Sequence, residues 1–135
     1  NTDLGDRTVL AEMITYGKAY YFAKHMMPCT PDSVFIGYTS EEIAGARANQ
    51  DMIWKRMIED EAFYATSAQV KQRYIAERPK TYEVGDQAPG RIGTWVGWQI
   101  VKKYASKSNL SLPEIMSLKD AKLIFNESGY RPGEK

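Results

Sequence analysis

Apolar residues recur at spacings of three and four, the repeat of an α-helix, along almost the whole of this 135-residue chain. The first such stripe consists of Leu10, Met13, Ile14, Gly17, Tyr20, Tyr21 and Met27. No long stretch alternates apolar and polar residues, as a half-buried β-strand would. The sequence therefore predicts an all-α fold, an irregular bundle of about five to six helices.

Capping residues predict where several helices begin and end. Thr39 with Glu42 and Ser111 with Glu114 have the spacing of capping boxes. We expect the helix that begins after Thr39 to continue to about residue 64. Further boundaries are predicted from single residues: Asp3 or Asp6 before the first helix and Pro28 at its end, Thr66 or Ser67 and Pro79 around a third helix, Ser117 with Asp120 before the last helix, and Gly129 after it. Residues 34–38 are expected to be extended, and residues 79–90 to form a long loop.

Composition places the chain among ordinary globular domains. Apolar residues make up 43% and charged residues 26% of the sequence, and the net charge is +1. A near-neutral chain has no electrostatic reason to bind nucleic acid. The one cysteine, Cys29, cannot form an internal disulfide, and the one histidine, His25, cannot build a histidine-based metal site alone. We expect one helical domain over residues 1–132 and a short tail over residues 133–135.

Residues 89–101 form the most unusual segment, a helix that contains glycine and tryptophan. Gly93 and Gly97 are four residues apart and lie on one helical face, where a neighbouring backbone can approach closely. The neighbouring Trp95 indicates a central, buried helix. Arg91, in the first turn, is a candidate to hold a carboxylate or a peptide carbonyl, with a salt bridge to Asp86 as the alternative. The many tyrosines and tryptophans either pack in the core or form a surface that grips a ligand, and the sequence leaves this open.

Two segments carry a resemblance to a known family. Residues 89–101 and 124–132 look like the C-terminal half of the gliding-motility lipoprotein GldB family of Bacteroidetes. Residues 17–18, 36–39 and 49–54 also fall in the order and approximate spacing of that family. The resemblance covers nearly the whole chain, and its glycine-tryptophan helix is the specific part.

The resemblance implies a domain of a lipoprotein of the cell envelope that faces the periplasm, and the missing metal ligand described below makes us expect this domain to be non-catalytic. Its role would be in gliding motility or the associated secretion machinery. The expected partners are other cell-envelope proteins, with contact to the membrane only through a lipid anchor outside this chain. Binding to nucleic acid is not expected, and homodimerisation is left open.

The GldB family is itself distantly similar to predicted zinc metallopeptidases, in which an HExxH helix lies upstream. The alternative function is therefore the substrate-side helical half of such a peptidase, and the fold would resemble the helical C-terminal subdomain of zincin-like enzymes. Tyr16 occupies the position of the candidate glutamate ligand, and a phenol with a pKa of about 10 is a poor zinc ligand. Glu12, one turn earlier, is the nearby substitute. We therefore expect no catalytic residue, no metal ligand and no cofactor, with zinc only under the alternative.

The candidate partner-binding groove lies beside the loop at residues 79–91. Its predicted lining combines polar, charged and aromatic residues from three regions of the sequence. These residues are Glu12, Tyr16, Lys18, Tyr82, Asp86, Arg91 and Trp98.

Overall fold

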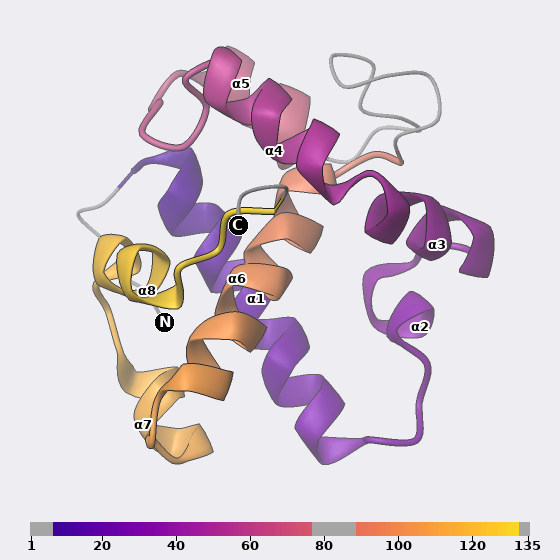
Figure 1. Ribbon diagram of the computed structural model, residues 1–135, viewed down its shortest axis with the longest axis vertical. Coiled ribbons are helices and arrows are strands. Elements are labelled where there is room, and N and C mark those ends of the chain that lie inside the picture. The colour runs from indigo at the N-terminus through magenta and orange to yellow at the C-terminus, as the bar shows by residue number, and fades with distance from the viewer. Residues whose placement is uncertain (1–6, 77–88, 133–135) are drawn as a thin grey trace.

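Eight helices and no strand are found in the residues that the computed structural model describes, which are 7–76 and 89–132 (Figure 1). The helices are α1 (Val9–Met26), α2 (Asp32–Ile36), α3 (Ser40–Ala48), α4 (Gln50–Glu59), α5 (Ala68–Tyr74), α6 (Ile92–Lys107), α7 (Leu112–Ser117) and α8 (Ala121–Ser128). Six of them have seven or more residues. The all-α prediction is confirmed for this part of the chain, and the predicted five to six helices correspond to the longer ones.

Helices α1 and α6 form the centre of the fold, and the shorter helices surround them (Figure 1). The two long helices cross with backbone against backbone. A Cβ atom on Gly17 would lie 2.5 Å from the carbonyl carbon of Gly97, and one on Gly97 would overlap the backbone of Met13. Gly93, one turn earlier on α6, lies close to α5, because a Cβ atom there would be 2.7 Å from the Tyr74 carbonyl oxygen. The predicted close approach at these glycines is confirmed, and it involves two different neighbours.

The start of α1 is fixed by the segment that follows α4. The first amides of a helix have no partner within it and must be satisfied from outside. The Val9 amide donates to the Ala65 carbonyl and the Leu10 amide to the Phe63 carbonyl, each over 2.8 Å. The side chain of Thr8 accepts from the Ala11 amide over 3.1 Å. These bonds hold Phe63 against the core.

Both capping boxes are confirmed. The Thr39 and Ser111 side chains accept from the amides of Glu42 and Glu114, and the two glutamates accept from the cap amides in return. Ser67 caps α5, and α8 ends at Gly129 in the left-handed conformation, with φ 64°. Helix α1 ends at residue 26, before the proline, as predicted.

Several predicted boundaries were wrong. Thr8 caps α1, and the alternatives Asp3 and Asp6 lie outside the described residues. The helix after Thr39 does not continue to residue 64, because the backbone leaves the helical conformation at Asn49 and α4 ends at residue 59. Asp120 caps α8, whereas residue 117 belongs to α7.

Residues 34–38 are not extended. Helix α2 occupies residues 32–36, and its apolar run was mistaken for a strand because five residues are too few to show a helical period. Gly37 ends the helix in the left-handed conformation, with φ 77°.

At α6, Arg91 precedes the helix instead of lying in its first turn, and it has φ 57°. Helix α5 ends at residue 74, several residues before Pro79, which lies outside the described residues with most of the predicted loop.

Candidate binding groove

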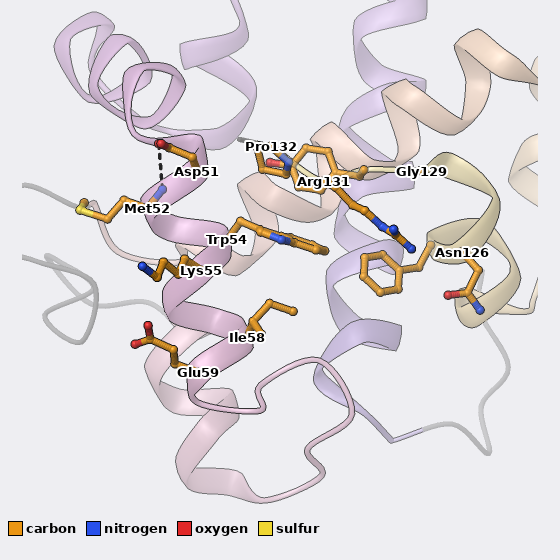
Figure 2. Close-up of a pocket in the computed structure, with 12 residues that line it drawn as sticks. Asp51, Met52, Trp54, Lys55, Ile58, Glu59, Asn126, Gly129, Arg131 and Pro132 are labelled. Atoms are coloured by element: carbon orange, nitrogen blue, oxygen red, sulfur yellow. Dashed lines mark hydrogen bonds between the residues drawn. The ribbon is translucent and has the colours of Figure 1, made fainter. Parts of the chain in front are cut away.

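A groove of about 980 Å³ separates α4 from α8 and the residues that follow it (Figure 2). The α4 wall runs along one side of that helix, and the opposite wall continues past the end of α8. The lining residues are Asp51, Met52, Trp54, Lys55, Ile58, Glu59, Phe125, Asn126, Gly129, Tyr130, Arg131 and Pro132. Trp54 and Ile58 point from α4 towards the opposite wall, where Arg131 and Asn126 are found (Figure 2).

Three aromatic rings line the base of the groove, those of Trp54, Phe125 and Tyr130, and the buried ring of Phe63, which does not line it, packs against two of them. The Trp54 ring centroid lies 5.0 Å from that of Phe63 and 5.6 Å from that of Phe125, and the two phenylalanine rings stack at 5.1 Å. Tyr130 meets Trp54 edge-on at 5.4 Å. Its hydroxyl lies 3.1 Å from the Gln50 side-chain oxygen, to which it donates, and burial raises the pKa of Tyr130. The four rings, which we call the aromatic floor, are held by packing and by this hydrogen bond.

The α4 wall combines apolar and charged side chains. Met52 and Ile58 leave 47% and 49% of their surface exposed, so the α4 wall offers apolar side chains to a partner. Asp51, Lys55 and Glu59 follow one another at intervals of four residues, so they lie along one side of α4. The edge of the groove therefore carries negative, positive and negative charge in turn.

Two of the predicted site residues, Tyr82 and Asp86, lie outside the described part of the chain. Glu12 forms an ion pair with Lys71 of α5, with 3.3 Å between its carboxylate oxygen and the lysine nitrogen. Tyr16 is exposed one turn further along α1, with its ring 6.4 Å from that of Tyr20. These two side chains therefore lie on or near the surface of α1.

Lys18 is fully buried. Its ammonium group donates to the Leu118 carbonyl, which connects α1 to the segment between α7 and α8. Burial lowers the pKa of Lys18, because a charged amine loses its hydration there. The contact gives this lysine a structural role between two distant parts of the chain.

Arg91 and Trp98 also contact the chain's own residues. The Arg91 guanidinium donates to the Ile36 carbonyl, so the predicted contact with a peptide carbonyl is found within the protein. Trp98 is only 1% exposed, and its ring lies 5.1 Å from Tyr20 and 6.3 Å from Phe35. Its indole N–H has no hydrogen-bond partner among the described residues. The five predicted residues that the structure describes all lie outside the groove between α4 and α8.

The aromatic floor was not recognised from the sequence. Trp54 reads as one member of a helical stripe, and Phe125 and Tyr130 are about 70 residues away from it. Only the tertiary fold brings these rings together. The one signal available was the abundance of aromatic residues, which does not distinguish a core from a binding surface.

Neither a metal site nor a membrane span is found in the described residues. No three histidine, cysteine, aspartate or glutamate side chains of this part of the chain are grouped as metal ligands would be. None of its helices combines the length and hydrophobicity that a bilayer crossing requires.

These observations define an all-α domain with an open, aromatic-floored groove on one side. The chain belongs to the family described as gliding motility protein GldB, whose model it matches over residues 1–132. This membership implies an association with gliding motility and an envelope lipoprotein. No curated protein and no solved structure matches the chain. The expected likeness to the helical part of zincin-like enzymes therefore stays a prediction.

Proposed function

We propose that this chain is a non-catalytic domain of a GldB-type envelope lipoprotein, and that it serves gliding motility or the associated secretion machinery by binding another envelope protein. The groove between α4 and α8 is the contact surface. We propose it in place of the predicted surface beside residues 79–91, because its lining lies entirely within the described residues, whereas Tyr82 and Asp86 do not. The partner faces the periplasm, as the lipid-anchored protein itself does.

The observation that carries this proposal is the pairing of half-exposed apolar side chains with a rigid base. Met52 and Ile58 are half exposed along the α4 wall, and Ile58 points towards the opposite wall, whereas the rings at the base are already packed against one another (Figure 2). A preformed aromatic base loses little conformational freedom when a partner binds, so more of the contact energy remains as affinity. Aromatic side chains in partly enclosed sites are also the residues that contribute most to protein interfaces.

The chemistry of Tyr16, at the position of the candidate metal ligand, and of Glu12, one turn earlier, agrees with a non-catalytic role. Tyr16 offers a phenol, which binds zinc poorly at neutral pH. Glu12 is paired with Lys71, and a metal would have to displace that lysine. Hydrolysis of casein by the full-length lipoprotein, sensitive to a chelator, would contradict this part of the proposal.

The groove is tested by a pair of matched substitutions in the full-length protein. Ile58→Asp places a charge at the entrance of the groove, whereas Val34→Asp places one on α2, where the side chain is 65% exposed and outside the groove. Each variant is expressed in a gliding bacterium that lacks its own copy, and colony spreading is measured. We expect Ile58→Asp to abolish spreading and Val34→Asp to preserve it, at equal protein levels. Equal spreading of the two strains would contradict the proposal.

A further inference from the structure

Three side chains of alternating charge lie along the edge of the groove, and their order can select a partner. Asp51, Lys55 and Glu59 are separated by about 6 Å per step, because four residues of an α-helix rise by that distance. Glu59 also lies 3.7 Å from Arg56, a contact between two well-exposed side chains that leaves its carboxylate accessible. A complementary surface must therefore offer basic, acidic and basic groups at the same repeat.

The repeat and the apolar base point to the same kind of occupant. A second α-helix repeats its own side chains every four residues, so it can follow the three charges along α4 without a change of register. An amphipathic helix also places apolar side chains on the adjoining face, where they would reach Trp54, Ile58 and Phe125. On the opposite wall, the exposed Arg131 adds a positive charge that an acidic side chain of the occupant would meet (Figure 2).

We propose that the occupant of the groove is an amphipathic helix of the partner protein, with basic, acidic and basic side chains at four-residue intervals beside its apolar face. This inference rests on the proposed function and adds the chemistry of the partner. Recognition comes from two sources. The aromatic floor binds the apolar face, and the three charges of α4 select the partner and its register.

Two other possible occupants are less complementary to the charges and apolar side chains of the groove. A second copy of this chain, paired antiparallel about Lys55, would set lysine against lysine and Asp51 against Glu59 of the other copy. An acyl chain would contact the aromatic floor but would leave the three charges of α4 without partners.

The test uses two helical peptides of about 18 residues with identical leucine anchors. One carries lysine, glutamate and lysine at four-residue intervals, and the other carries glutamate, lysine and glutamate at the same positions. Binding of each labelled peptide to the full-length protein is measured by fluorescence anisotropy at low salt. We expect the first peptide to bind about tenfold more tightly, and we expect the difference to disappear in about 1 M salt.

A charge reversal on the protein makes the test specific. The triple variant Asp51→Lys, Lys55→Glu, Glu59→Lys is expected to prefer the second peptide. Glu41→Lys on α3 changes the net charge by the same amount, lies outside the groove and is expected to keep the original preference. The salt dependence of the unmodified protein needs no variant, so it decides the question even if the triple variant does not fold.

Each contrary result has a distinct meaning. Equal binding of both peptides would overturn the charge rule while leaving the groove as a binding surface. Binding of lauric acid with no binding of either peptide would overturn the inference in favour of an acyl chain. Self-association in sedimentation that Ile58→Asp abolishes would overturn it in favour of a second copy. Failure of the proposed function itself is seen separately, in the spreading of the Ile58→Asp strain.

Discussion

Gly17 of α1 and Gly97 of α6 lie so close together that a Cβ atom on the first would be 2.5 Å from the carbonyl carbon of the second. Glycine in the middle of a helix lowers its stability by about 1 kcal/mol relative to alanine. Close contact between the two helices offsets this loss, because without side chains at both positions their backbones can touch. The crossing holds the centre of the fold and, through α6, the segment that carries α8.

Gly97→Ala is expected to lower the free energy of unfolding by about 3 kcal/mol or more. The added methyl group would overlap the backbone of Met13, which cannot move aside as a flexible side chain would. Urea denaturation followed by circular dichroism measures the loss. An unchanged unfolding midpoint would show that α1 and α6 are not in contact at this residue.

Gly45→Ala is the matched control, with the opposite expected sign. Gly45 lies within α3, and a Cβ atom there would meet no other atom within 4 Å. Alanine should therefore stabilise the protein by about 0.5–1 kcal/mol, since it favours the helix and restricts the unfolded chain. A loss of stability in the same denaturation experiment would contradict the free space beside this glycine.

Tyr38→Phe tests the connection between α2 and the start of α6. The Tyr38 hydroxyl donates to the Gly90 carbonyl over 2.5 Å, and burial raises the pKa of this tyrosine. Removing the hydroxyl leaves a buried carbonyl without its partner, so we expect a loss of about 1–3 kcal/mol. Tyr64→Phe, at an exposed tyrosine, should change stability by less than about 0.5 kcal/mol. Equal effects of the two substitutions would refute the hydrogen bond.

Lys18→Met tests the buried lysine through the pH dependence of stability. Burial holds the pKa of Lys18 below its ordinary value of 10.5, so over the interval between the two pKa values the unfolded chain binds more protons than the folded protein. Charging the buried amine lowers the stability of the folded protein. This loss of stability is fully present below the pKa that Lys18 has in the folded protein, and it disappears as the pH rises towards the ordinary lysine pKa. The stability of the unmodified protein relative to Lys18→Met should therefore increase as the pH rises from neutral towards 10.5. A constant difference between the two proteins would show that Lys18 is hydrated in the folded state.

Local features of the fold were predictable because each depends on residues that are neighbours in sequence. A capping box needs only Thr39 and Glu42, and a helical stripe needs only one helix. The interruption at Asn49 was missed because the apolar pattern continues across it, and the short helix α2 because five residues cannot show a helical period. Such features depend on packing that no local pattern records.

The candidate site was less predictable for the same reason. Arg91 stood out as an arginine beside glycines, and its predicted contact with a peptide carbonyl is found, but with the chain's own Ile36. Lys18 was predicted to line a partner-binding groove, yet it is buried and contacts a carbonyl 100 residues further along the chain. The groove requires Trp54 to meet Phe125 and Tyr130, and only the tertiary fold brings these three rings together.

The most direct test of binding in this groove is site-specific photo-crosslinking of the full-length protein in gliding cells. A photoreactive residue replaces Met52 at the edge of the groove or, as the control, Val34 on α2. We predict a discrete adduct with a different envelope protein from position 52, absent from position 34 and lost when Ile58→Asp is added. Adducts of equal yield from both positions, or no adduct from position 52, would contradict the account.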